Sequence, residues 1–292
     1  MAEAVTIFEV APRDGLQNEQ RHIATHDKIR LVDLLSAAGL RKIEVTSFVS
    51  QKAVPQMADA GEVLTGIARR RGITYAALTP NLRGYRAARL AGADEVAVFA
   101  SASEGFSKNN INCSIDESFE RFQPVLDAAR SDGVAVRGYV SCVIKCPYDG
   151  ATAPERAAWI ARRLLDLGCY EISLGDTVGA GTPETVLPMI DAVCELVPVQ
   201  HLAGHFHNTN GRALDNIGVC LAKGLRVFDA SAGGLGGCPF APGAAGNADT
   251  CDVARYLERR GYATSIDMLK LDDAALFARS LRTHYDLQHD PR

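Results

Sequence analysis

Two histidines separated by one residue, His205 and His207, form the local pattern that most directly suggests chemistry. Residues two apart on a β-strand point to the same face, so both imidazole rings would project together. Such a pair can bind a divalent metal ion, or it can be two histidines that are simply satisfied by hydrogen bonds. The choice depends on which other polar side chains lie beside the pair.

Asp14 and Asn247 offer the oxygen atoms that would complete such a site. Two nitrogens with a carboxylate and an amide oxygen suit Mg²⁺ or Mn²⁺, with Co²⁺ or Zn²⁺ as alternatives. Taken alone, Asp14 predicts an Asp-Gly turn, and Asn247 predicts the N-cap of a helix. Because a barrel would place all four residues at one mouth, we predict a metal site formed by Asp14, His205, His207 and Asn247.

Three further charged residues, Arg13, Glu44 and Asp176, lie within or just after predicted strands, as Asp14 and the two histidines do. Arg13 directly precedes Asp14. Glu44 alternates with apolar residues in a predicted strand, and a carboxylate on the inner face of a barrel is costly unless it is paired or coordinating. Asp176 ends another predicted strand, but strict alternation would put it on the side of Leu174, away from the barrel interior. Arg13, Glu44 and Asp176 are therefore candidate catalytic residues, and the placement of Asp176 is open.

A glycine-rich run, Gly233 to Pro239, contains Cys238. It lacks the Lys-Ser/Thr pair of a phosphate-binding P-loop, so a nucleotide site has little support. We predict a mobile lid that carries one reactive thiol, with an idle surface loop as the alternative. The other seven of the 8 cysteines are scattered, and we expect them to be buried small hydrophobic residues.

The elements that would position these residues follow a regular alternation. Short apolar runs predict strands at 5–10, 42–47, 74–79, 95–100, 134–141, 170–174, 201–207 and 226–231. Helical patterns follow them near 25–38, 57–71, 81–91, 115–131, 154–167, 183–196, 211–223 and 249–260, with a further segment near 265–286. Thr25, Ser114 and Thr182 are the predicted start signals of three helices.

Eight strand–helix repeats with short connections predict an α/β fold, a (β/α)8 TIM barrel with an additional C-terminal helical segment. We expect residues 1–292 to form a single catalytic domain. A doubly wound open sheet is the alternative, but the turn after the first strand is not the glycine-rich nucleotide-binding type. The predicted site residues follow the C-terminal ends of strands, where barrel enzymes place their active sites.

Composition excludes several classes of function. The net charge is −4 and the charged fraction is 23%, without a basic run that would predict binding of nucleic acid or an anionic membrane. No stretch approaches the ~20 apolar residues that span a bilayer. The N-terminal residues resemble neither a signal nor a transit peptide, so we expect a cytoplasmic protein.

The sequence resembles the 3-hydroxy-3-methylglutaryl-CoA lyase family over nearly its whole length. Matching stretches are residues 9–19, 46–50, 78–82, 110–114, 137–142, 173–177 and 234–239. The resemblance implies cleavage of this acyl-CoA to acetyl-CoA and acetoacetate, with the metal held by Asp14, His205, His207 and Asn247. It further implies that Arg13 contacts the thioester carbonyl, that Glu44 and Asp176 support the site, that Cys238 is catalytic, and that a homodimer is expected. Either Cys238 or His205 could supply the final proton.

The sequence departs from the family after the second histidine. Asn208 and Asn210 stand where the family carries Asp and Tyr, and Cys251 stands where it carries Glu. We expect the lost charges to lie near the metal, so a related substrate, such as a longer 3-alkylglutaryl-CoA or a citramalyl-type ester, is an alternative. Further alternatives are a condensing synthase and a catalytically silent protein that binds metal and CoA esters.

Overall fold

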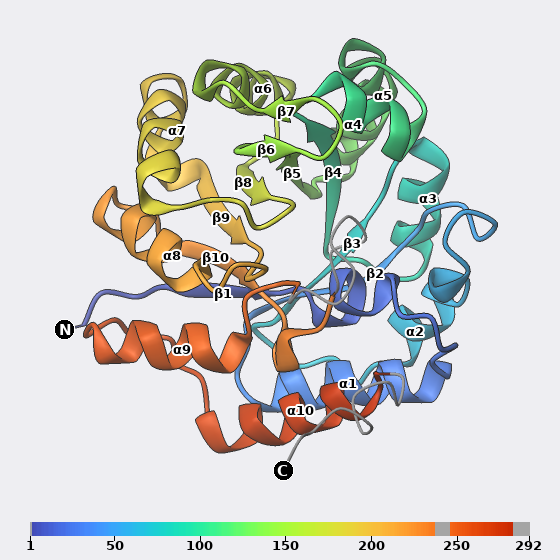
Figure 1. The fold of residues 1–292 in the computed structure, drawn as a ribbon. Helices are drawn as coiled ribbons and strands as arrows, with labels where there is room; N and C mark the ends of the chain where they lie inside the picture. The colour runs from blue at the N-terminus through green and yellow to red at the C-terminus, as the bar shows by residue number, and fades with distance from the viewer. Residues whose placement is uncertain (1, 237–245, 283–292) are drawn as a thin grey trace.

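The computed structural model describes residues 2–236 and 246–282 (Figure 1). Within them, parallel strands close into a barrel in the order β1-β10-β9-β8-β5-β4-β3-β2. The barrel strands are β1 (Thr6–Glu9), β2 (Lys42–Ser47), β3 (Thr74–Leu78), β4 (Glu95–Ser101), β5 (Ala135–Ser141), β8 (Glu171–Asp176), β9 (Leu202–Phe206) and β10 (Val227–Ala230). The predicted barrel is confirmed, and the open doubly wound sheet is wrong.

Helices surround the barrel on the outside (Figure 1). They are α1 (Thr25–Ala37), α2 (Ala60–Gly66), α3 (Leu82–Leu90), α4 (Glu104–Ile111), α5 (Ile115–Asp132), α6 (Pro154–Leu167), α7 (Pro183–Leu196), α8 (Ala213–Ala222), α9 (Thr250–Arg259) and α10 (Met268–Ser280). A short antiparallel hairpin, β6 (Lys145–Cys146) and β7 (Gly150–Ala151), follows β5. Helix α10 is the additional C-terminal helix, and it packs against α1.

The helix boundaries show which start signals operate. Ser114 caps α5, with Glu117 completing a capping box, as its position predicts. Thr25 does not cap α1: Ala24 is the N-cap, and the Thr25 hydroxyl donates to Asp59 at 2.8 Å. Helix α2 is shorter than predicted because the chain is already extended at Ile67. Helix α4 and the β6–β7 hairpin have no counterpart in the sequence prediction.

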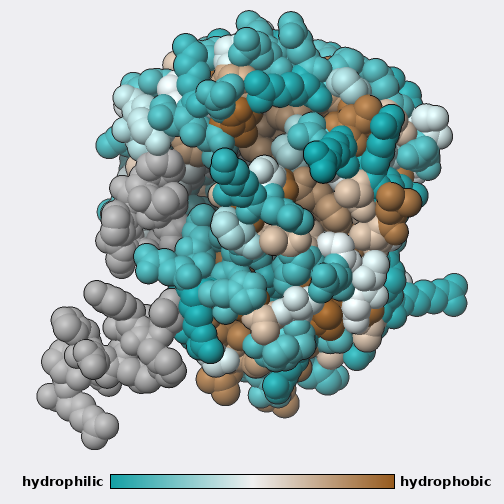
Figure 2. Space-filling view, turned by 90° about the vertical axis from the view of Figure 1, so that its right-hand side faces the viewer, coloured by the Kyte–Doolittle hydropathy of each residue, from teal (hydrophilic) through white to brown (hydrophobic). Residues whose placement is uncertain are grey.

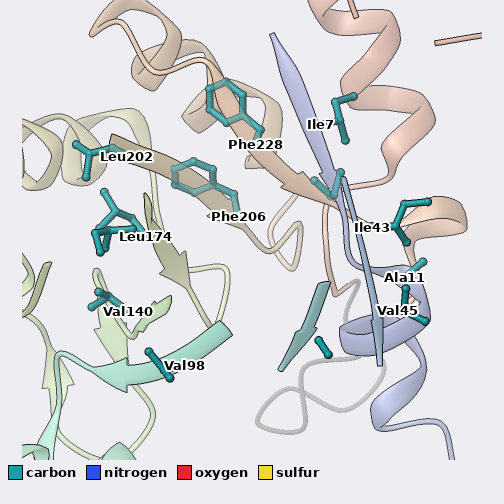
Figure 3. Close-up of a cluster of buried hydrophobic side chains, with 14 of the residues drawn as sticks. Ile7, Ala11, Ile43, Val45, Val98, Val140, Leu174, Leu202, Phe206 and Phe228 are labelled. Atoms are coloured by element: carbon teal, nitrogen blue, oxygen red, sulfur yellow. The ribbon is translucent and has the colours of Figure 1, made fainter. Parts of the chain in front are cut away.

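An aliphatic layer joins the strands to the helices. Side chains on the outer face of the barrel are fully buried, as Figure 3 shows for Ile43, Val98, Val140, Leu174 and Phe228. Burial of such side chains contributes about 1.5–3 kcal/mol each relative to leaving them exposed. Because this layer already stabilises the strands, the residues on the inner face of the barrel do not all have to be apolar.

The interior of the barrel contains charges in place of the usual branched aliphatic side chains. Arg137 on β5 is 0% exposed, and its guanidinium bonds Glu171 at 2.7 Å and Asp229 at 2.7 and 3.1 Å. The guanidinium also stacks 4.2 Å from the ring centroid of Phe8. The buried guanidinium is thus paired with two carboxylates, and such pairing is the condition for tolerating buried charges.

The face drawn in Figure 2 is largely hydrophilic, with smaller hydrophobic areas between the hydrophilic residues. Among the described residues, none of the helices combines the length and the apolar character that crossing a bilayer requires. The described cysteines are buried, apart from the half-buried Cys194, as their scattering predicts.

Candidate active site

A tight turn after β1 presents Arg13 and Asp14 at the barrel mouth. Residues Ala11–Gly15 form one π-helical turn, in which the N–H groups of Arg13, Asp14 and Gly15 all lie within 3.2 Å of the carbonyl oxygen of Val10. This geometry replaces the simple Asp-Gly turn that Asp14 alone would predict. It places two consecutive side chains in contact, with Arg13 Nη1 2.5 Å from Asp14 Oδ1.

The two histidines lie together at the end of β9, as their spacing predicts. Their ring centroids are 5.3 Å apart, and both side chains are buried. One potential ligand atom from each of Asp14, His205 and His207 lies within 4.8 Å of the others. The turn after β1 and the end of β9 therefore bring a carboxylate and two imidazoles to one point.

Asn247 joins this group from the segment that precedes α9. It forms an antiparallel bridge with His207, and its side-chain Nδ2 donates to Asp14 Oδ2 at 2.8 Å. The N-cap of α9 is Asp249, so the interpretation of Asn247 as a helix cap is wrong. All four predicted metal ligands thus lie at the same end of the barrel.

The electrostatics of this group favour a cation. Burial would raise the pKa of Asp14, but Arg13 and the two histidines outweigh it and lower the pKa to about 2. Burial, together with the nearby His205, lowers the pKa of His207 to about 4. A carboxylate that stays ionised and an imidazole that stays neutral are the forms in which these groups bind metal ions.

The hydrogen bonds of the histidines also fit a metal. His205 Nδ1 lies 3.0 Å from Asp229 Oδ2, which leaves Nε2 available. His207 Nδ1 is buried and has no hydrogen-bond partner within the described part of the chain. An unpaired buried nitrogen of this kind costs free energy unless a ligand satisfies it. The residues present therefore fit a divalent cation bound by nitrogen and oxygen ligands.

The second contact of Arg13 is Glu44 on β2. Arg13 Nε donates to Glu44 Oε2, and the other carboxylate oxygen, Oε1, has no partner among the described residues. Ile43 and Val45 on either side pack in the aliphatic layer, as alternation predicts. Glu44 thus holds Arg13 from inside the barrel.

Asp176 lies apart from this cluster. It is the last residue of β8 and fully buried, and its carboxylate accepts hydrogen bonds from the backbone N–H groups of Ala180, at 3.1 Å, and Gly181, at 2.7 Å. The alternation that puts Asp176 on the side of Leu174 therefore holds. Its direct contacts shape the loop after β8, while its charge still acts on His205.

A cavity of about 460 Å³ opens over Arg13, Asp14, His205 and His207. Its lining differs around the barrel mouth. Polar residues from the β1 and β9 ends (Arg13, Asp14, His205, His207) line one part, and apolar residues from β3, β4 and the α4–α5 region (Leu78, Phe99, Phe106, Ile111, Phe122) line the other. The cavity therefore offers a charged centre beside an apolar wall.

Tyr139 stands where the two parts of the cavity meet. Its ring lies 5.4 Å from the guanidinium carbon of Arg13, and its buried hydroxyl has no partner in the described part of the chain. Burial, assisted by the charge of Glu44, raises the pKa of Tyr139 well above its usual value. The residue lines the cavity, and its hydroxyl group is neutral and buried.

The glycine-rich loop is described only at its base. Cys238 lies outside the described residues, so the prediction of a catalytic thiol on a lid stays a prediction. At the base, Gly236 has φ +99°, and a Cβ there would lie 2.7 Å from Asn247 Nδ2. A side chain at position 236 would therefore displace one of the predicted metal ligands.

Asn208 and Cys251 have other surroundings than their sequence positions suggest. Asn208 Oδ1 accepts from the N–H of Ala213 at the start of α8, at 3.2 Å. Asn210 donates to Gly179 O at 2.9 Å, and Cys251 is buried with its Sγ 4.0 Å from Leu271 O, between α9 and α10. These side chains thus contact loops and the packing between two helices, and the expectation that they lie near the metal stays a prediction.

Sequence reasoning missed the residues beneath the site. Asp229 contacts His205, and Arg137 holds Asp229. Glu9 on β1 bonds three segments that lie next to site residues. The argument applied to Glu44, that an inward carboxylate needs a partner, would have found Asp229, since it stands between Phe228 and Ala230 in an apolar strand. The same argument would have found Arg137, which precedes Gly138 in the strand that ends at Ser141.

The HMGL-like family model matches residues 4–277. A Pseudomonas aeruginosa protein named 3-hydroxy-3-isohexenylglutaryl-CoA/hydroxy-methylglutaryl-CoA lyase is 57% identical over 274 residues, covering 94% of this chain and 91% of that protein. The crystal structure of the HMG-CoA lyase from Brucella melitensis matches with a TM-score of 0.95 and 59% identity, covering 96% of this chain and 99% of that one. A structure from Acinetobacter baumannii, an HMG-CoA lyase in complex with coenzyme A and 3-methylmalate, matches with a TM-score of 0.90 and 37% identity, covering 99% and 95%.

Proposed function

Because this chain belongs to the HMGL-like family, we propose that it is a carbon–carbon lyase that cleaves 3-hydroxy-3-methylglutaryl-CoA to acetyl-CoA and acetoacetate. The observation that carries the proposal is the meeting of Asp14, His205 and His207 within 4.8 Å, beside the guanidinium of Arg13 and on the wall of one cavity. This arrangement can bind a hydroxyl group and a thioester carbonyl side by side.

The reaction breaks the bond between C2 and C3 of the acyl chain. The C3 hydroxyl loses its proton, and its oxygen forms the ketone C=O of acetoacetate as the electron pair of the C2–C3 bond moves to C2. The resulting thioester enolate takes up a proton at C2 and becomes acetyl-CoA. A divalent ion bound by Asp14, His205, His207 and Asn247 would supply a Lewis acid that lowers the pKa of the hydroxyl group. Mg²⁺ and Mn²⁺ are the ions we propose, since the donor set contains both oxygen and nitrogen.

Arg13 stabilises the negative charge that develops on the thioester oxygen. Its guanidinium stays cationic at every physiological pH and is held in a fixed orientation by Glu44 and Asp14. The ring of Tyr139 adds a cation–π contact at 5.4 Å. An orientation fixed before the reaction makes such a charge effective, because no reorganisation is needed in the transition state.

The proton for C2 comes from Cys238 in this proposal, or from His205, whose Nε2 would then have to carry a proton instead of holding the metal. His205 lies beside Arg13 and the cavity, and the carboxylate of Asp229 raises its pKa against the effect of burial. Cys238 would reach the same space from the glycine-rich loop. Asp176 supports the site through the loop after β8. A homodimer and a cytoplasmic location remain predictions from the sequence.

A second candidate substrate follows from the apolar wall. Leu78, Phe99, Phe106 and Phe122 give part of the cavity an apolar lining, which can contact an alkyl group at C3. The P. aeruginosa relative carries an isohexenyl ester in its name, which supports the same idea. We propose that 3-hydroxy-3-alkylglutaryl-CoA esters with longer alkyl groups are alternative substrates.

The decisive experiment measures acetyl-CoA release from a panel of 3-hydroxyacyl-CoA esters, with and without Mg²⁺. The panel contains the 3-methylglutaryl ester, a longer 3-alkyl homologue and a citramalyl-type ester. Metal-dependent release from the first supports the proposal. Activity with another ester alone would assign that ester as the substrate. Net formation of a longer ester from acetyl-CoA would indicate a synthase. Binding of metal and ester without turnover would indicate a catalytically silent protein.

A further inference from the structure

Asp229 and His205 lie directly opposite each other on neighbouring strands. Asp229 of β10 pairs with His205 of β9 in the parallel register, so both side chains point into the barrel. Asp229 Oδ2 lies 3.0 Å from Nδ1 of the imidazole. The contact is therefore built into the strand register and does not depend on a loop.

The Asp229 carboxylate is itself fixed on all sides. Arg137 donates to both of its oxygens, at 2.7 and 3.1 Å, and the Ser173 hydroxyl donates to Oδ2 at 2.8 Å. Glu171, at 2.7 Å, holds Arg137 from the other side. Asp229 is 2% exposed, so water does not compete for these bonds.

A carboxylate in this position determines which imidazole nitrogen carries the proton. Only an N–H can donate to a carboxylate, so Nδ1 of His205 keeps its hydrogen and Nε2 presents a lone pair. Such partners orient metal-binding histidines and increase their basicity, and losing one typically costs ~10–100-fold in metal affinity or activity. His207 has no comparable partner in the described part of the chain.

We propose that Asp229 is a positioning residue that holds the His205 ring and its tautomer for metal binding. Arg137 and Ser173 hold Asp229 in turn, so a relay of fixed groups runs from the middle of the barrel to the metal site. This inference rests on the proposed function, because it assigns His205 to a metal. The inference goes beyond that function because it attributes part of the metal affinity to a residue that touches neither metal nor substrate.

The test compares Asp229→Asn with Glu171→Gln. Both variants remove one buried carboxylate from Arg137, but only the first changes the group that faces His205. Mn²⁺ affinity of the apoprotein is measured by calorimetric titration, and folding is measured by thermal unfolding. We expect Asp229→Asn to weaken Mn²⁺ binding ~10–100-fold, whereas Glu171→Gln lowers stability and leaves the affinity within a small factor of the wild type.

Equal Mn²⁺ affinity in the wild type and Asp229→Asn would overturn the proposal, as would equal losses in both variants. If Asp229→Asn does not fold, ¹⁵N-histidine NMR of the wild-type apoprotein decides the question. A protonated Nδ1 on His205 supports the proposal, and an unprotonated Nδ1 overturns it. A wild type that binds Mn²⁺ but cleaves no ester would refute the proposed function alone, while one that binds no metal would refute both.

Discussion

The carboxylate of Glu9, on β1, accepts a hydrogen bond of 2.8 Å from the hydroxyl of Thr250, which lies 241 residues further along the chain. Its other oxygen accepts from the N–H groups of Ala11, at 2.8 Å, and Ala232, at 3.0 Å. These three donors belong to the turn that carries Arg13 and Asp14, to the base of the glycine-rich loop, and to the helix after Asn247. One buried carboxylate thus joins the three segments.

The ionisation of Glu9 should make stability depend on pH. Burial raises the pKa of Glu9 from 4.5 to about 7, so between these values the native state keeps a proton that the unfolded chain has lost. The stability from this proton is complete below pH 4.5 and is lost as the pH rises through 7. Relative to Glu9→Gln, which cannot titrate, we expect the wild type to lose about 3 kcal/mol of unfolding free energy across this window.

Urea unfolding at a series of pH values measures this difference. Glu120→Gln, at an exposed position of α5, is the matched control, and its curve should run parallel to that of the wild type. Because all other titrating groups are shared, the difference between curves isolates Glu9. Parallel curves for wild type and Glu9→Gln would show that Glu9 does not titrate in this range.

Removal of divalent metal should abolish turnover. Chelator treatment should leave an inactive protein, and Mg²⁺ or Mn²⁺ should restore acetyl-CoA release. His207→Ala should fold but lose Mn²⁺ binding, while His201→Ala, at the opposite end of β9, should keep it, because His201 bonds only the backbone of Tyr170 among the described residues. Full activity in a sample shown to be free of metal would contradict the proposed mechanism.

Arg13→Lys tests the role of the guanidinium in the transition state. Lysine keeps the charge but cannot bond Glu44 and Asp14 in the same fork. We expect kcat to fall by ~10²–10³, as for the loss of an oxyanion donor, with Mn²⁺ affinity retained. Arg121→Lys, which alters another arginine of the cavity, should have little effect on kcat. An unchanged kcat with a raised KM would assign Arg13 to substrate binding alone.

Cys238→Ser tests the proposed catalytic thiol. We expect a folded protein that loses most of its turnover, and a wild type that thiol alkylation inactivates unless substrate is present. The other cysteines are poor targets, since those described are buried apart from the half-buried Cys194. Cys194→Ser is therefore the control for the alkylation experiment. A fully active Cys238→Ser would exclude any required chemistry of this side chain.

The apolar wall of the cavity should set the length of the alkyl group at C3. Leu78→Phe fills part of this wall, so kcat/KM should fall more for a longer 3-alkyl ester than for the 3-methyl ester. Leu90→Phe, at a position 90% exposed on α3, should change neither value. An equal fall for both esters would show that the alkyl group lies elsewhere.

The barrel could be predicted because short apolar runs, which form the strands, alternate along the chain with helical patterns. The predicted strand at 42–47 is the observed β2, and the helix at 115–131 is α5, which ends one residue later, before the left-handed Gly133. Helix α4 could not be found in this way. Its eight residues show little apolar periodicity, and its ends depend on the Ser103 cap and on Asn112 in the left-handed region.

The site was predictable where residues follow strand ends, because parallel strands bring those ends together. Asp14, His205, His207 and Asn247 meet for this reason. Contacts that depend on register across the barrel were not predictable: Arg137 meets Asp229 from strands that are not neighbours. The packing of Cys251 between α9 and α10 was not predictable either, because it depends on the contact with Leu271, 20 residues further along the chain.

The charged interior of the barrel limits the routes by which this sequence can evolve. Loss of Arg137 alone would leave Glu171 without its buried counter-ion and Asp229 with His205 alone as a positively charged partner among the described residues. Breaking a buried pair costs about 3–5 kcal/mol. That is a large share of the ~5–15 kcal/mol that separates a native protein from its unfolded state. An all-apolar replacement of the three can be as stable, yet each single step toward it passes through a severely weakened protein. Positions 137, 171 and 229 should therefore change together among descendants of this sequence, or stay as they are.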